Sequence, residues 1–389
     1  MGLSTSLPRS PNLALVVLVN MAAPGPTFHP NWDAQNPQLR EAFRNLRVRK
    51  ALSHGMNREE INQIVYYGLL ESSGYSFGPL SPYFDPEAYQ KYAWYDPQLA
   101  NSLLDDAEIT LEANPEDLDE ELANAYVAQG VNRFSVGVQS LLDERLALLD
   151  RGHDAARGRE SVRAAVASGA SVSLDLIFGT PGQTEASWRA ELTDAVALGA
   201  DHVSIYDLTV EPRTRLDRMI RDGAYGPLDD GLSARLFDLT REALSAAGFV
   251  HYEVSSYARP GHEARHNRGY WHGLPYLGIG AAAHGLLARR RWVNVRRPAA
   301  YMDAVGQGEP EASSEHLDEP TWVWERVLTG LRDLQLGVES STIEALESPA
   351  YDSLLERGYL ERSGARVRVA HDRVPLLDSV LLELAPDVP

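Results

Sequence analysis

From residue 108 onward, short runs of β-branched and apolar residues alternate with longer segments in which apolar positions recur every three or four residues. Short apolar runs bounded by turns are typical of buried strands, and the longer period is typical of amphipathic helices. The pattern predicts strands over residues 108–112, 132–138, 171–178 and 201–208. It predicts helices over residues 119–129, 157–168, 185–198 and 230–247.

Strand–helix alternation of this kind predicts an α/β fold built on a parallel sheet or barrel. Because crossovers in such folds are short and right-handed, we expect the strands to lie parallel and adjacent in chain order. Chemistry in these folds concentrates at the carboxyl ends of the strands. The polar residues at those ends are therefore the candidates for a site.

The pattern changes past residue 320. Helices are predicted over residues 322–333, 342–346 and 351–357, followed by a strand pair around a turn over residues 364–369. This order of elements is typical of a small winged-helix-like domain.

The first hundred residues lack strand–helix alternation. Residues 39–65 have helical spacing, with Asn57 as a candidate N-cap, and residues 97–106 are predicted to form a second short helix. An apolar run at residues 13–19 faintly resembles a signal peptide, but a buried strand is the interpretation that we favour. The second helix runs into residue 108 without the Pro/Gly-rich connector that usually marks a domain boundary, which indicates an abrupt join.

Composition narrows the classes of chemistry. The 389-residue chain has a formal net charge of -19, so it would repel a phosphate backbone, and nucleic acid is not an expected partner. It has no cysteine, which excludes disulfides, thiolate zinc sites, cysteine nucleophiles and an iron–sulfur cluster held by cysteines. No stretch approaches the roughly 20 apolar residues that a membrane span requires.

Polar side chains stand where the predicted strands end, at Glu112, Gln139, Asp175 and Glu211. Any one of them can be a helix cap or a loop residue that satisfies backbone groups. Carboxylates and an amide that converge on one rim can also hold ribose hydroxyls through paired hydrogen bonds. We therefore predict that Glu112, Gln139 and Asp175 point toward the same rim of the sheet.

Five histidines, His251, His262, His266, His272 and His284, are interspersed with aromatic residues. Imidazole is a common axial ligand of haem iron, and aromatic rings can pack against a porphyrin face. His262 and His266 also have the spacing of neighbours on a helix, which would suit zinc. Surface or core histidines without a ligand are the third interpretation, and the residues by themselves leave all three open.

A set of linked segments resembles a known family. The segments are ITLEANP, GVNRFSVGVQS, SLDLIFGTPGQTEASW, DHVSIYDLTVEPRT, HYEVSSYARPG, HNRGYW and YLGIGAAAHG. In this order and spacing they resemble the HemW haem-chaperone family, close kin of the oxygen-independent coproporphyrinogen III oxidases in the radical S-adenosylmethionine class. The resemblance runs from residue 108 to the C-terminus. It implies a partial barrel that keeps the last four of six strands, followed by the family's small C-terminal domain.

The resemblance implies roles for individual residues. Positions that contact S-adenosylmethionine in the oxidase branch are matched by Glu112, Gln139, Arg151 and Asp175. The HNxxYW motif associated with haem binding is matched by His266, Asn267, Tyr270 and Trp271, with His266 as the implied ligand of the haem iron. His262 follows a Pro-Gly turn that should leave it exposed, so haem binding is expected to depend on His266. The family also implies haem-accepting proteins as partners and a cytoplasmic location.

The chain departs from this family at its N-terminal side. Family members open with a strand and a CxxxCxxC loop that ligates a [4Fe–4S] cluster, then a strand with a GGGTP-like turn that holds the methionyl amine, and neither is present. Residues 31–107 instead resemble a piece of a family 5 peptide-binding protein of ABC transporters, through LREAFRNLRVRKALSHGMNREEINQIVYYGL and SPYFDPEAYQKYAWYDPQLANSLLDDA. We therefore expect a chimera of a solute-binding-protein-like fragment (1–107), a truncated radical S-adenosylmethionine barrel (108–320) and a winged-helix-like domain (321–389).

The leading hypothesis is a HemW-like haem chaperone, with haem and S-adenosylmethionine as the implied ligands, impaired because the cluster ligands are missing. One alternative is a peptide-binding module that rests on the N-terminal fragment alone. Another is a chimera without function, in which the strand edge at residues 108–112 leaves backbone groups unpaired. Whether the chain is an enzyme stays open, because the resemblance to the oxidases does not extend to the cluster cysteines.

Overall fold

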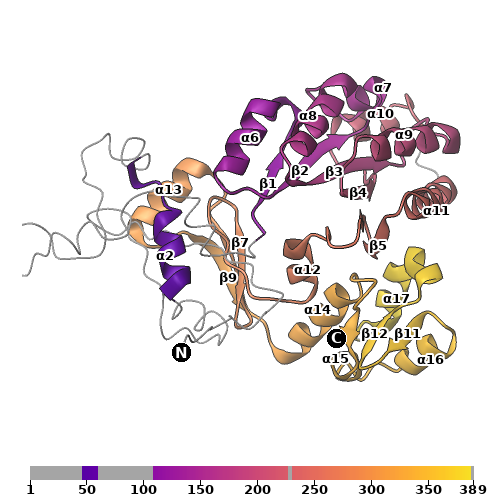
Figure 1. Ribbon diagram of the computed structural model, residues 1–389. Helices are drawn as coiled ribbons and strands as arrows, with labels where there is room; N and C mark the ends of the chain where they lie inside the picture. The colour runs from indigo at the N-terminus through magenta and orange to yellow at the C-terminus, as the bar shows by residue number, and fades with distance from the viewer. Residues whose placement is uncertain (1–45, 60–107, 227–229, 387–389) are drawn as a thin grey trace, which may run out of the picture. The chain divides into compact units, whose positions relative to one another are not determined.

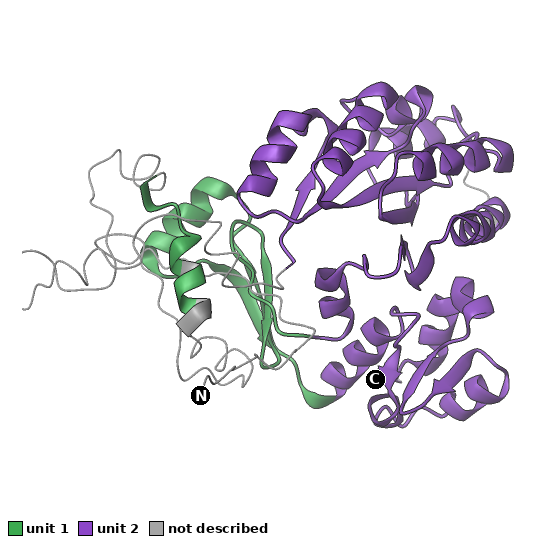
Figure 2. Ribbon diagram, viewed as in Figure 1, with its two compact units in different colours: residues 1–107, 274–319 green, residues 108–273, 320–389 purple. Residues whose placement is uncertain are grey.

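The computed structural model describes residues 46–59, 108–226 and 230–386. The chain forms two compact units, unit 1 with residues 1–107 and 274–319 and unit 2 with residues 108–273 and 320–389 (Figure 2). The domain boundaries expected after residues 107 and 320 stay predictions. The apolar run at residues 13–19 and the second short helix at residues 97–106 lie outside the described residues.

The described part of the first predicted helix is α2 (Leu46–His54). The helix ends at His54, and helical backbone resumes at Arg58, directly after the candidate N-cap Asn57. The Arg58 guanidinium donates to the carbonyl oxygen of Ser53 at 2.6 Å and so satisfies a backbone group that the helix end leaves open. Asn57 stands directly before Arg58, and its role as an N-cap stays a prediction.

Unit 2 is built on a 6-stranded mixed sheet in the order β1-β2-β3-β4-β6-β5. Its strands are β1 (Thr110–Ala113), β2 (Arg133–Gln139), β3 (Ser171–Phe178), β4 (His202–Asp207), β5 (Val250–Glu253) and β6 (Ser256–Ala258). Strands β1 to β4 are parallel and adjacent in chain order, which confirms the prediction, and β6 and β5 form an antiparallel hairpin beside β4.

Helices cover one face of this sheet, with α6, α8 and α9 lying along it (Figure 1). The helices of this part are η1 (Pro115–Asp117), α6 (Glu120–Ala128), α7 (Asp143–Leu148), α8 (Ala155–Ala167), α9 (Glu185–Ala197), α10 (Arg215–Arg221), α11 (Asp230–Ala246) and α12 (Arg265–Trp271). The covered face is apolar, and its buried side chains include Phe134, Leu174 and Trp188. Helix α8 begins two residues before its predicted start because the Asp154 carboxylate accepts the N–H of Arg157 and caps it.

The C-terminal part of unit 2 has the expected winged-helix-like order. Its elements are α14 (Glu319–Gly330), β10 (Val338–Glu339), α15 (Ser340–Glu344), α16 (Tyr351–Glu356), β11 (Leu360–Ser363), β12 (Arg366–Val369), η2 (His371–Leu376) and α17 (Leu377–Leu384). The three strands form an antiparallel sheet over a core of their own that includes Val327, Leu354 and Val367. Helix α14 ends earlier than predicted because the chain turns after it, and the N–H of Leu334 donates to the Tyr252 carbonyl on β5 at 2.9 Å.

Unit 1 contains a second antiparallel sheet. Its elements are β7 (His284–Leu287), β8 (Arg290–Asn294), α13 (Pro298–Gln307) and β9 (Glu311–His316). The side-chain amide of Asn294 donates to the carbonyl oxygens of Gly278 and Gly280 at 3.2 and 2.9 Å, which fixes the loop before β7. Within the described ranges of both units, no helix has the length and apolar character needed to cross a membrane.

His251 on β5 is a half-buried histidine with a perturbed pKa. Its ring stacks on Tyr257 with centroids 4.2 Å apart, and its Nε2 lies 3.1 Å from the Val254 carbonyl oxygen. Burial lowers the pKa of His251 to about 4, and the nearby charges of Arg241 and His371 act in the same direction. The imidazole is therefore neutral in the folded protein at neutral pH.

This pKa shift predicts acid sensitivity. The unfolded chain takes up a proton at His251 near its ordinary pKa of 6.5, whereas the folded protein does so only near about 4. Between these values the unfolded state binds more protons, so stability falls as the pH falls. Urea unfolding at pH 7.5 and 4.5 should show that His251→Phe loses less stability on acidification than the wild type, by up to about 3 kcal/mol.

The exposed His284 of β7 provides the matched control. His284→Gln should follow the wild type across the same pH range, because it also removes one histidine but leaves the surroundings of His251 unchanged. If the free energy of unfolding changed equally with pH in the wild type and in His251→Phe, the lowered pKa of His251 would be contradicted.

Candidate functional site

The second face of the parallel sheet is polar. Glu112 on β1 is paired in register with Ser135 on β2, and Ser135 is paired with Ser173 on β3. Asp175 and Ser204 are paired between β3 and β4. Since residues two positions apart on a strand point to the same side of the sheet, all five side chains share one face. We call this the polar face.

Asp175 lies at the centre of the polar face. Its Oδ2 accepts a hydrogen bond from the Ser135 hydroxyl at 3.1 Å, and its Oδ1 accepts one from the Ser173 hydroxyl at 3.1 Å. Burial raises the pKa of Asp175, the serine hydroxyls of three strands oppose that rise, and the Glu112 carboxylate adds to it. A carboxylate has about four lone-pair sites, so Asp175 retains capacity for a ligand hydroxyl.

Gln139 reaches the polar face through an irregularity at the end of β2. Its backbone is left-handed, with φ 66°, and the register with β3 shifts between positions 136 and 139. A Cβ placed on Gly137 would lie 3.0 Å from Nε2 of Gln139, so the amide occupies the space of the missing side chain. Gly137 follows Ser135 by two positions, which puts the amide on the same side as Glu112 and Asp175. The structure therefore brings these three side chains to one side of the sheet.

Two other residues singled out from the sequence lie elsewhere. Arg151 is exposed in the loop between α7 and α8, and its backbone N–H donates to the carbonyl oxygen of Leu146 at 2.9 Å. Glu211 is exposed in the loop after β4, where its backbone carbonyl, rather than its carboxylate, accepts the Thr214 hydroxyl at 2.8 Å. Among the described residues, no hydrogen bond or ion pair joins Arg151 to Glu112.

Sequence reasoning missed other members of the polar face. His202 and Tyr206 flank Ser204 at two positions on either side along β4. Burial raises the pKa of Tyr206 to about 12, and the charge of Asp175 adds to the shift. His202 is buried, and its Nε2 lies 2.8 Å from the Tyr252 hydroxyl. The signal was present in the sequence, because polar residues recur at every second position of otherwise apolar strands.

The HNRGYW segment forms α12, a short helix with two distinct sides. His266 and Tyr270 lie one turn apart on the first side, with ring centroids 4.5 Å apart and planes at 79°. Arg268 and His272 project from the other side, because a step of two residues turns a helix by about 200°. His266 is exposed, and half-buried side chains belong to Asn267, Tyr270 and Trp271.

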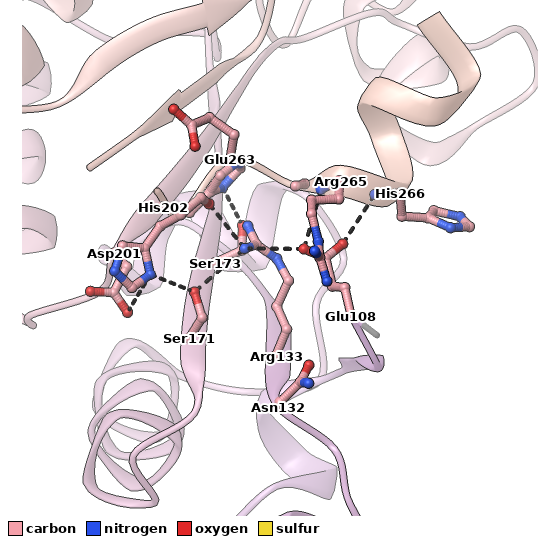
Figure 3. A network of polar contacts seen from close by, with 12 residues as sticks. Glu108, Asn132, Arg133, Ser171, Ser173, Asp201, His202, Glu263, Arg265 and His266 are labelled. Atoms are coloured by element: carbon pink, nitrogen blue, oxygen red, sulfur yellow. Dashed lines mark hydrogen bonds and ion pairs between the residues drawn. The ribbon is translucent and has the colours of Figure 1, made fainter. Parts of the chain in front are cut away.

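A carboxylate at the start of the sheet holds the first turn of α12 (Figure 3). Glu108 accepts the backbone N–H of Arg265 at 3.2 Å and that of His266 at 3.0 Å. The buried Arg133 guanidinium on β2 lies 3.9 Å from the same carboxylate and donates to the His262 carbonyl oxygen at 2.9 Å. Residue 108 was predicted as part of a strand, but β1 begins two residues later, which leaves the Glu108 side chain to contact α12.

A second carboxylate, from the turn after α14, holds the far side of α12. Asp333 is fully buried, and its Oδ2 accepts Arg268 Nε at 2.9 Å and His272 Nε2 at 3.0 Å. Its Oδ1 accepts the backbone N–H of Gln335 at 3.0 Å and of Leu336 at 2.7 Å. Burial by itself would raise the pKa of Asp333, but the hydrogen bonds from His272 and Arg268 outweigh it and lower the pKa.

His262 does not behave as the sequence suggested. It lies in the loop before α12, so it is not a helical neighbour of His266, and the spacing that suggested a zinc pair is not realised. It is also less exposed than His266, because its Nδ1 lies 3.0 Å from the Ser171 hydroxyl and 3.6 Å from an Asp201 oxygen. The side chain is still 39% exposed after the Pro-Gly turn.

The remaining histidines have separate surroundings. His251 is stacked on Tyr257, His272 is bound to Asp333, and His284 is exposed on β7 of unit 1. The described part of the chain holds no group of three or more His, Cys, Asp and Glu side chains placed to bind a metal.

The residues fit the groups implied by the sequence unequally. A cluster held by cysteine thiolates does not fit, because the chain has no cysteine. The carboxylates and amide of the polar face suit ribose hydroxyls, and they fit the nucleoside part of S-adenosylmethionine. The exposed imidazole of His266 beside the Tyr270 ring fits an axial ligand of haem.

Two family profiles match parts of the chain. The profile described as radical SAM superfamily matches residues 86–195, and the one described as bacterial extracellular solute-binding proteins, family 5 middle, matches residues 13–138. The second match extends past residue 107 into β1 and β2, which the structure places in the parallel sheet of unit 2.

Similar proteins cover most of the chain. Haem chaperone HemW of Mycobacterium tuberculosis strain H37Rv is 39% identical over 72% of this chain and 73% of its own length. HemW of a Synechocystis strain is 36% identical over 67% of this chain and 65% of its own length. The solved structure of coproporphyrinogen III oxidase HemN from Escherichia coli, at 19% identity, superposes with a TM-score of 0.60 over 74% of each chain, which shows a shared fold. The chain belongs to the HemW family of radical S-adenosylmethionine proteins.

Proposed function

We propose that this protein binds haem as a HemW-type chaperone but does not carry out the reductive chemistry of its superfamily. The observation that carries the proposal is α12, which presents His266 and Tyr270 on one side while its other side is fixed by Arg268 and His272. Haem is proposed as the ligand because the relatives described above are named haem chaperones. Haem-accepting proteins and a cytoplasmic location are part of the same proposal.

His266 suits an iron ligand better than its neighbours do. The ring of His262 is held at Nδ1 by the Ser171 hydroxyl, and the ring of His272 is held at Nε2 by Asp333. Both residues are half-buried against the fold, whereas His266 is exposed. No hydrogen bond links the ring of His266 to another described residue, and Tyr270 supplies apolar surface beside it. An axial imidazole needs such shielding from water.

The polar face supports a reduced role for S-adenosylmethionine. Glu112, Gln139 and Asp175 can bind ribose hydroxyls through their side-chain oxygens and amide. When bound, this cofactor supplies a radical only through one-electron reduction by an iron–sulfur cluster. The cysteine ligands of that cluster are missing, so we propose that any retained site is a binding site without turnover.

A peptide-binding role has less support. It rests on the match at residues 13–138, and the last part of that match folds as β1 and β2 of a sheet that continues through β3 and β4. Those two strands complete the sheet that carries Glu112 and Gln139 in this fold. The radical S-adenosylmethionine assignment therefore accounts for this stretch better than a solute-binding lobe does.

Anaerobic reconstitution tests the loss of cluster chemistry. After incubation with iron and sulfide, the protein should show no charge-transfer absorption and should release no 5′-deoxyadenosine from S-adenosylmethionine under reductant, because thiolate ligands are absent. A family member with an intact CxxxCxxC loop serves as the positive control in the same mixture. Stoichiometric cluster iron together with 5′-deoxyadenosine would overturn this part of the proposal.

Haem titration tests the iron ligand. Ferric haem added to the wild type should shift the Soret band, and His266→Ala should abolish that shift because it removes the axial imidazole. His262→Ala is the matched control, since it removes a neighbouring histidine whose ring is already held by Ser171. Loss of the Soret shift in His262→Ala alone would refute the assignment.

A further inference from the structure

Asp333 joins three parts of unit 2 within a few ångströms. It lies in the turn after α14 and forms an isolated antiparallel bridge with Glu253 of β5. Its Oδ1 accepts the backbone N–H groups of its own turn and a 3.4 Å bond from Arg268 Nη2. Its Oδ2 accepts Arg268 Nε of α12 and Nε2 of His272, which directly follows the helix. The carboxylate thus connects the C-terminal part to the helix that presents His266.

The surrounding contacts fix α12 at the same place. The Arg332 guanidinium lies 5.9 Å from the centroid of the Trp271 ring. Directly after the helix, Gly273 has φ +62°, and a side chain there would overlap with the guanidinium of Arg326 on α14. Backbone, cationic and aromatic groups of α12 therefore pack against residues of the C-terminal part, and Asp333 is the fully buried acid among them.

We infer that Asp333 is a positioning residue for the haem-binding side of α12, an inference that rests on the proposed function. With Arg268 and His272 held by one buried carboxylate, α12 cannot rotate about its axis without breaking charged hydrogen bonds. His266 lies on the opposite side of the same two-turn helix, so its imidazole keeps a fixed direction toward a bound porphyrin. Glu108 fixes the first turn from the sheet, and Asp333 fixes the orientation.

Asp333→Asn separates this role from a role in folding. The substitution keeps an acceptor oxygen for the N–H groups of Gln335 and Leu336, so the local turn is retained, but it puts an NH₂ group opposite Arg268. We expect haem affinity to fall about tenfold or more, as for other residues that orient a ligand, with a Soret band displaced from that of the wild type. Glu383→Gln, which breaks the exposed 2.7 Å pair with Arg357 in the same C-terminal part, should leave both unchanged.

Arg268→Gln removes the same Arg268–Asp333 contact from the side of the helix. It provides a second test if Asp333→Asn does not fold. In the double variant the losses should not add, because both changes remove one interaction. Additive losses, or affinities and Soret bands equal to those of Glu383→Gln, would overturn the inference.

Hydrogen exchange of residues 265–272, measured without haem, tests the positioning role of Asp333 independently of haem binding. If the wild type binds no haem, the proposed function fails, and the positioning role is then judged from exchange alone. Faster exchange of this segment in Asp333→Asn than in Glu383→Gln supports it, and equal exchange refutes it.

Discussion

The structure depends on a parallel sheet with two unlike faces. Parallel sheets are usually apolar on both sides because helices cover both. Here one face packs Phe134 and Leu174 against the helices, whereas the other face gathers carboxylate, hydroxyl, amide and imidazole groups. Burying Asp175 on that face raises its pKa, and the serine hydroxyls around it offset part of the desolvation. Desolvating so many polar groups lowers the stability of the fold, and a bound ligand would give these groups a function that offsets this cost.

The sheet also fixes the position of α12, and it does so through charged groups rather than apolar packing. Arg133 is buried on β2, and its guanidinium lies beside Glu108, whose carboxylate accepts the first N–H groups of α12. The helix has only seven residues and would not be stable alone, so its geometry must come from these contacts and from Asp333. Two carboxylates from distant parts of the chain therefore define where His266 stands.

The sequence was sufficient for the parallel strands because their signal is local. Alternation of apolar and polar positions depends on near neighbours, and so did the expectation that Glu112 and Asp175 share a side. Gln139 reached that side through a register shift that no periodicity encodes. The role of Asp333 could not be predicted from the sequence, because it contacts Arg268 across 65 residues of chain. A single acidic residue after a helix also forms no distinctive pattern.

The same contacts bear on the proposed haem binding by a chain that has no cluster cysteines. The family resemblance places the cluster cysteines and the methionyl site on the N-terminal side of the segment that begins at residue 108, and the chain has no cysteine. Among the described residues, α12 is held by contacts of Glu108, Arg133, Arg268, His272 and Asp333, and all of these residues lie in unit 2. In the proposed function, the residues that bind haem and the residues that would ligate a cluster belong to separate segments of the chain. The absence of cluster cysteines leaves these contacts intact, because each of them is made between residues of unit 2.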